Sequence, residues 1–186
     1  MKSTYITVVG NLPISFDLAE SMRLGPVIAS SNSNKSILFP YATCNSEQNL
    51  QDMLNSPSFY NSDLLVPEKL FKKYLFFDNV NCLPDFPGVK TLDIDPNTCT
   101  PQLLSLLLAI YLKIKHIFLL GFDISNPLEM VRMKSITLEN LDHKFIIVGK
   151  ELGKMKKALK LDGIKNCYRD NYFKYQEVID KHGRKK

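Results

Sequence analysis

The stretch that decides the fold is residues 100–123, TPQLLSLLLAIYLKIKHIFLLGFD. Its first part predicts a helix over residues 102–114 that is apolar nearly all round, with Thr100 as its N-terminal cap. The run Ile117–Leu120 then predicts a strand, which ends at Gly121. A helix with apolar residues on every side must be covered by other elements, so we expect it to lie deep against a sheet.

On both sides of this stretch, short β-branched runs alternate with amphipathic segments, which is typical of parallel α/β packing. The pattern predicts one Rossmann-like α/β domain over residues 1–171, with a mostly parallel twisted sheet, helices on both faces, and a basic tail over 172–186. Further strands are expected at Tyr5–Val9, Pro26–Ser30, Ile37–Phe39, Asp63–Val66, Tyr74–Phe77, Thr91–Ile94, Phe145–Val148 and Ile164–Tyr168. Further helices are expected at Phe16–Leu24, 46–55, Pro67–Lys73 and Glu151–Leu161.

Length and composition favour an ordinary globular protein. The 186 residues are 45% hydrophobic and 23% charged, enough to bury a continuous core without disulfides or metal. The four cysteines are scattered, without a CxxC pair or a histidine at ligand spacing, so we expect reduced thiols and no metal site. The sequence also predicts no bound cofactor.

The chain is expected to be cytoplasmic. Its first residues lack the apolar core of a signal peptide, and the longest apolar run, Leu103–Leu112, is too short to span a bilayer. The sequence does not indicate an oligomeric state.

Positive charge is concentrated at the end of the chain. Residues 1–150 hold 13 Lys or Arg and 14 Asp or Glu, whereas residues 151–186 hold 11 and 5, which leaves a net charge of +6 in the last segment. Such a segment can contact phosphate, nucleic acid or an acidic partner, or it can simply be a solvated end.

Three loops are candidates for a ligand site, because parallel sheets bind ligands outside the carboxyl ends of their strands. The first begins with Gly10 and Asn11, where a glycine allows close backbone approach and an amide both donates and accepts hydrogen bonds. A structural turn explains this loop equally well. The other two loops follow the second strand, with Ser31, Asn32 and Asn34, and the Ile117–Leu120 strand, with Gly121 and Asp123. Asp123 could equally cap the segment that follows it.

Acid–base candidates are few. His143 precedes a predicted strand and is the only histidine that its loop could carry to the site, whereas His116 opens a strand at the amino edge. The chain has no GxSxG, Walker or HExxH motif, so the sequence does not support a hydrolase.

Two parts of the sequence together resemble a known family. The opening Ile6-Thr7-Val8-Val9-Gly10-Asn11-Leu12-Pro13 with Ile28-Ala29-Ser30-Ser31-Asn32, and the later Leu108–Asp123 stretch, resemble bacterial lipooligosaccharide sialyltransferases and the pterin pyrophosphokinase-like family. The resemblance implies a metal-independent Rossmann-like transferase that uses a cytidine nucleotide-sugar. It implies that Asn11 and Asn32 contact the nucleotide, that Thr100 and Ser125 occupy nucleotide-site positions, and that His143 corresponds to the catalytic histidine.

The sequence departs from this family at several of those positions. Leu12 and Ile14 replace the glycine and serine of the first turn, and Ser125 replaces a tyrosine. Two hypotheses therefore stay open. One is a small glycosyltransferase-like enzyme with a nucleotide-activated donor, in which Asp123 shapes the pocket. The other is a non-catalytic derivative that serves as a binding or assembly module, at home in a phage or other mobile genome, with the basic tail as its contact surface. Nucleic-acid binding through the tail is a third hypothesis.

Overall fold

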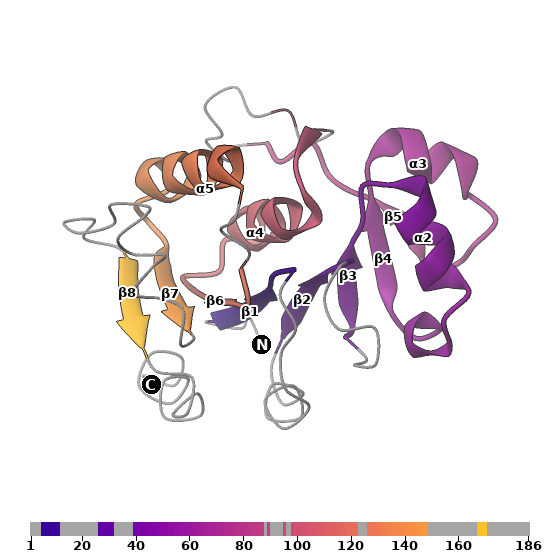
Figure 1. Cartoon of the computed structure of the whole chain (residues 1–186), viewed down its shortest axis with the longest axis horizontal. Coiled ribbons are helices and arrows are strands. Elements are labelled where there is room, and N and C mark those ends of the chain that lie inside the picture. The colour runs from indigo at the N-terminus through magenta and orange to yellow at the C-terminus, as the bar shows by residue number, and fades with distance from the viewer. Residues whose placement is uncertain are drawn as a thin grey trace.

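The computed structural model describes residues 5–11, 26–31, 39–87, 89, 95, 98–122, 126–148 and 167–170. These residues form one eight-stranded sheet with helices packed on it, which confirms the predicted α/β fold (Figure 1). The strands are β1 (Tyr5–Val9), β2 (Val27–Ser30), β3 (Tyr41–Thr43), β4 (Asp63–Val66), β5 (Val80–Cys82), β6 (His116–Leu120), β7 (Lys144–Val148) and β8 (Cys167–Asp170). The helices are α2 (Glu47–Leu54), α3 (Glu68–Lys73), α4 (Pro101–Tyr111) and α5 (Pro127–Glu139), with a short 3-10 turn at Pro57–Phe59.

The sheet is parallel at every pairing, in the order β5-β4-β3-β2-β1-β6-β7-β8. The chain builds outward from β1 to β5 on one side and then returns to place β6 against the other side of β1. Val8 of β1 therefore lies between Ile28 of β2 and Leu119 of β6. This reversal of strand order is the point at which open α/β sheets bind ligands.

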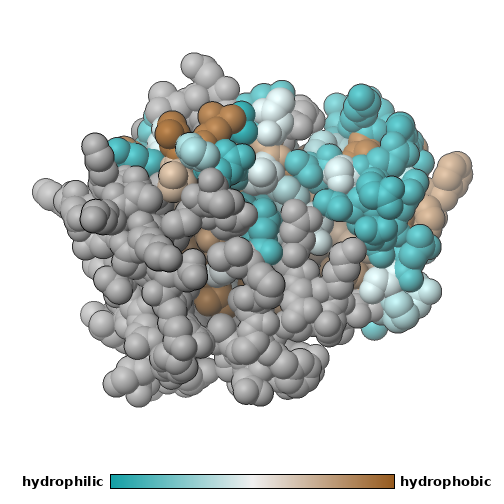
Figure 2. Space-filling model, in the orientation of Figure 1, coloured by the Kyte–Doolittle hydropathy of each residue, from teal (hydrophilic) through white to brown (hydrophobic). Residues whose placement is uncertain are grey.

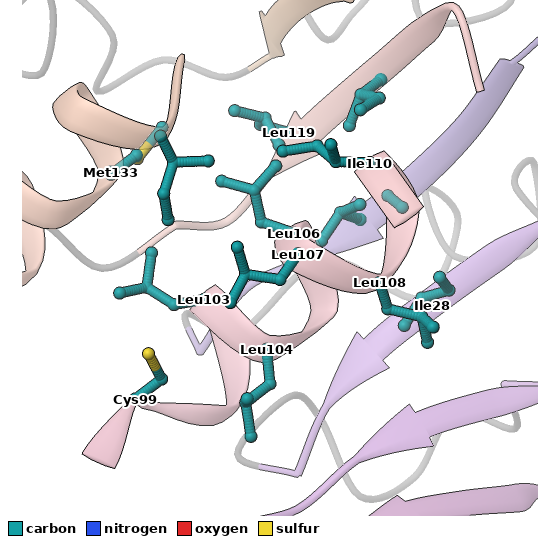
Figure 3. Close-up of a cluster of buried hydrophobic side chains, with 14 of the residues drawn as sticks. Ile28, Cys99, Leu103, Leu104, Leu106, Leu107, Leu108, Ile110, Leu119 and Met133 are labelled. Carbon is teal, nitrogen blue, oxygen red and sulfur yellow. The ribbon is translucent and has the colours of Figure 1, made fainter. Parts of the chain in front are cut away.

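Helix α4 supplies the largest part of the core. Ten consecutive residues from Pro101 to Ile110 are buried, and the helix packs on β1, β2 and β3. Figure 3 shows its leucines between Ile28 of β2 on one side and Leu119 and Met133, from β6 and α5, on the other. The expectation that this helix lies deep against the sheet is confirmed.

A second hydrophobic cluster lies on the opposite face of the sheet, beneath α2 and α3. Ala42 and Leu64 belong to it together with Leu50 and Met53 of α2. Ala42 pairs with Ala29, the neighbour of Ile28, and successive residues of a strand point to opposite faces. Helices therefore cover both faces, as predicted.

Two predicted strands are displaced in the structure. Tyr74–Phe77 forms a turn rather than a strand, and the edge strand β5 begins only at Val80. The Tyr74–Phe77 prediction was wrong: Leu75, Phe76 and Phe77 are exposed, Phe76 at 95%, and only Tyr74 packs against the core. Phe39 likewise lies outside any strand, and β3 begins at Tyr41.

Helix α5 was not predicted. Its start carries a clear signal, because the Asn126 side chain caps the helix and Pro127 occupies its first turn. Leu128 and Val131 are exposed, however, so apolar residues lie on more than one side of the helix and its periodicity is weak. The expected helices Phe16–Leu24 and Glu151–Leu161, the strand Thr91–Ile94 and the tail lie outside the described residues.

None of the helices in the described ranges combines the length and the apolar character needed to cross a membrane.

Truncating the centre of α4 tests its role in stability. Leu107 is fully buried in the main cluster, so Leu107→Ala should lower the free energy of unfolding by about 2–5 kcal/mol. Urea denaturation followed by circular dichroism measures this change. Leu112→Ala, at the half-exposed end of the same helix, is the matched control and should cost much less. Equal losses in the two variants would contradict the assigned burial of α4.

Candidate functional site

The candidate site lies at the carboxyl edge of the sheet, where β1 and β6 end side by side. Val9 pairs with Leu120, so Gly10 and Gly121 follow neighbouring strands at the same level. The predicted association of these two loops is therefore present in the structure.

Gly10 is required by the contact between these loops. Its amide donates a 2.8 Å hydrogen bond to the carbonyl of Leu120. A Cβ added at Gly10 would lie 2.5 Å from the carbonyl oxygen of Gly121 and 2.6 Å from the Cα of Phe122. Gly121 itself adopts a positive φ of 63°, which glycine accepts without strain. The backbone of Gly121 and Phe122 fills the space beside Gly10 in which the sequence suggested a close approach of a ligand.

Asn11 is anchored on both sides at this edge. Its amide N–H approaches Oε1 of Gln102 at 3.4 Å, and its side-chain Oδ1 accepts a 2.7 Å hydrogen bond from the hydroxyl of Ser30. Within the described ranges its side-chain nitrogen donates to no protein group. The side chain is partly buried, so Asn11 presents a fixed donor at the reversal of strand order.

Polar side chains hold the start of α4 against this edge. The Thr43 hydroxyl lies 2.7 Å from both the carbonyl oxygen of Pro101 and the hydroxyl of Ser105. Ser105 also donates to the carbonyl of Ala29 at 3.2 Å. These groups are fully buried and partnered, so they bind the helix start to β2 and β3.

Thr100 meets a different partner from the expected one. Its hydroxyl does not cap α4 but donates to Oε2 of the buried Glu129, in the first turn of α5. Oε1 of Glu129 lies 3.8 Å from the Arg132 guanidinium, which also donates to the carbonyl of Thr98. Thr100 thus joins the starts of α4 and α5.

Ser31 follows β2 with its side chain enclosed. Its hydroxyl is buried and makes no hydrogen bond within the described part of the chain. It lies near the thiol of Cys44, whose pKa is raised by burial. An unpaired buried hydroxyl is rare, because it gives up its hydrogen bonds to water without replacement.

His143 lies at the other edge of the sheet. It precedes β7, and its Nδ1 is 2.7 Å from the carbonyl oxygen of Ile114, which precedes β6. The next residue, Lys144, donates its amide to Lys115 in the same region. The structure therefore does not bring His143 to Gly10 and Asn11, because the residues before parallel strands collect at the amino edge.

The remaining predicted site residues, Asn32, Asn34, Asp123 and Ser125, lie outside the described residues. Among the described ones, no group of three or more His, Cys, Asp or Glu could hold a metal ion.

No family model, curated protein or solved structure matches the chain.

Ser30 belongs to the predicted loop Ser30–Asn34, whereas Thr43, Gln102 and Glu129 were not predicted as parts of this edge. Two signals were available. Gln102 is a polar residue in an otherwise apolar helix, and Glu129 stands three residues after the capping Asn126. Thr43 carries no such signal, because single hydroxyl residues at strand ends are common.

Replacing Gly10 tests the loop contact. Gly10→Ala should lower the free energy of unfolding by about 1–3 kcal/mol, because the added methyl meets backbone atoms that cannot rotate away. Thermal and urea unfolding measure the loss. A wild-type unfolding midpoint for Gly10→Ala would contradict the close approach of the two loops.

Cysteine reactivity tests the enclosure of this region. Burial raises the pKa of Cys99 to about 12, and burial also raises the pKa of Cys44, so both stay protonated at pH 8. Since the thiolate is the nucleophile, site-resolved iodoacetamide labelling at pH 8 should modify Cys99 and Cys44 more slowly than the partly exposed Cys82. The Cys99 rate should still be rising with pH at pH 10. Equal labelling of the three would contradict the burial.

Proposed function

We propose that this protein binds a nucleotide, or the nucleotide part of an activated sugar, at the carboxyl edge of its sheet between β1 and β6. The observation that carries the proposal is the geometry of Asn11. Ser30 fixes its Oδ1 at the reversal of strand order, which leaves the side-chain nitrogen to donate to a ligand. The resemblance to cytidine nucleotide-sugar transferases favours a cytidine nucleotide.

The hydrogen-bonding groups at this edge suit such a ligand. A ribose, a phosphate and the Watson–Crick edge of cytosine all present oxygen or nitrogen acceptors to an amide donor. The Ser31 hydroxyl follows the neighbouring strand β2 and has no hydrogen-bond partner in the described part, but it is enclosed. The Asn11 side-chain nitrogen is therefore the group that would gain a hydrogen bond when a ligand binds.

Binding without group transfer is the form that the described residues favour. Both of their histidines, His116 and His143, lie at the amino edge, and the carboxylate of Glu129 is buried and bound by Thr100. A general base must come within hydrogen-bond reach of the proton that it removes. The second candidate is the metal-independent sugar transferase implied by the resemblance, with Asp123 in the pocket. It is supported by the placement of Gly10 and Gly121 at adjacent strand ends.

Isothermal titration with CMP, CDP, UDP and GDP tests the binding. We expect CMP or CDP to bind, and Asn11→Ala to raise the Kd at least about tenfold, since a hydrogen bond to a charged or polar ligand group is lost. Asn81→Ala, which removes an exposed amide on β5, is the matched control and should bind as the wild type does. The absence of heat with all four nucleotides at millimolar concentration would refute the proposal.

Release of CMP from a CMP-activated sugar separates the two candidates. A binding protein should release none beyond the uncatalysed rate. If release is observed, the transferase is correct, and His143→Ala should then leave the rate unchanged because His143 lies at the amino edge. A loss of activity in His143→Ala would contradict that placement of the site.

A further inference from the structure

Exposed apolar side chains gather at one end of the sheet, away from the candidate site. Ten large hydrophobic residues are exposed in the described part of the chain, and five of them surround the starts of β3, β4 and β5. We call these five the aromatic patch: Tyr41, Tyr60, Leu75, Phe76 and Phe77. Figure 2 shows hydrophobic atoms protruding at the right-hand edge of the molecule, beside the hydrophilic surface over α2 and α3.

The patch is held in place by the structure beneath it. The Asn79 side chain donates to the carbonyls of Phe59 and Ser62, so the turn before β5 is tied to the turn before β4. Phe77 donates its amide to Tyr74, and their rings are 6.0 Å apart. Phe76, at the tip of this turn, is 95% exposed. A fixed turn with its phenylalanine in water is unfavourable for an isolated molecule.

The size of the patch suits a protein interface. With about 200 Å² for a fully exposed large side chain, the five residues expose roughly 600 Å². That is at the upper limit for patches on monomers and approaches the ~800 Å² that each partner buries in a standard interface.

The surroundings of the patch are acidic. Residues 41–87 contain three lysines and six Asp or Glu, a net charge of −3. Lys72 and Lys73 are occupied by Glu68 and Glu47, at 2.6 and 2.8 Å. Among the described residues, no Lys or Arg forms an ion pair with the exposed acids Asp63 and Asp78 beside the patch. A partner for this surface should therefore be basic as well as apolar.

The chain itself contains a segment with that chemistry. Residues 172–186 hold five Lys or Arg and two Asp or Glu, a net charge of +3, and include Tyr172, Phe173 and Tyr175. This segment follows β8, whereas the patch lies by β5, and these are the outermost strands at opposite ends of the sheet (Figure 1).

We propose that the aromatic patch binds the basic C-terminal segment of a second copy of this chain, so that the molecules associate head to tail. Eight strands place β5 about 34 Å from β8, and an extended chain needs about ten residues to cross that distance. If residues 172–186 reached the patch of their own molecule, most of these 15 residues would be used to cross the sheet. In the segment of a second copy, all of them can contact the patch. The two surfaces differ, so the contact is heterologous and can continue into longer assemblies.

Sedimentation velocity of the full chain between about 1 and 200 μM is the first test. The weight-average mass should rise with concentration at low salt and fall in 0.5 M NaCl, because screening weakens the charge contact. The variant Leu75→Ser/Phe76→Ser should weaken association at least about tenfold and keep the wild-type circular dichroism spectrum. Leu112→Ser, which removes an exposed leucine elsewhere, is the matched control and should associate like the wild type.

A mixing experiment decides the geometry. The patch variant keeps an intact tail, and a chain lacking residues 172–186 keeps an intact patch, so each alone should be monomeric. Mixed in equal amounts, they should form a 1:1 dimer and no larger species. A wild type that stays monomeric at 200 μM overturns the proposal, and so does a mixture that stays monomeric. If the tail-deleted chain still associates, the partner of the patch is another patch, which also overturns the head-to-tail arrangement.

Discussion

The burial of α4 against β1, β2 and β3 is the constraint on which the rest of the structure depends. Ten consecutive buried residues leave this helix no solvent face, so neighbouring elements must enclose it. The sheet lies beneath it, and α5 contributes Met133 at its side (Figure 3). The helix also connects β5 to β6, which carries the chain back across β1. The core and the reversal of strand order are therefore produced by one element.

The same helix determines the chemistry of the carboxyl edge. At its first turn the apolar core gives way to polar groups: the Asn11 amide after β1, the Thr43 hydroxyl of β3 and the Glu129 carboxylate of α5. Most of these groups bind one another, and Ser30 fixes the side chain of Asn11, whose nitrogen has no protein partner within the described ranges. This fixed donor is the reason why we propose nucleotide binding at this edge.

The sequence predicted the parallel sheet well, because its buried strands are β-branched and alternate with helices. The prediction failed where apolar side chains lie at the surface. Leu75, Phe76 and Phe77 are apolar yet exposed, and α5 has leucines on its outer side. At the site, Gly10, Asn11 and Gly121 were foreseen because they follow strands. The partners of Asn11 were not, since Gln102 lies 91 residues away and only the packing of α4 brings them together. His143 does not lie beside Gly10 and Asn11, because it precedes β7 and is therefore at the amino edge.

The position of α4 in the chain has a consequence for how the protein is made. Strands β1, β2 and β3 are complete by residue 43, but the helix that covers them spans residues 101–111. During synthesis one face of these strands stays uncovered while more than fifty further residues leave the ribosome. The nascent chain then exposes parallel strands whose contacts are distant in sequence, and such contacts form slowly. The order of the elements therefore delays the burial of this face until late in synthesis.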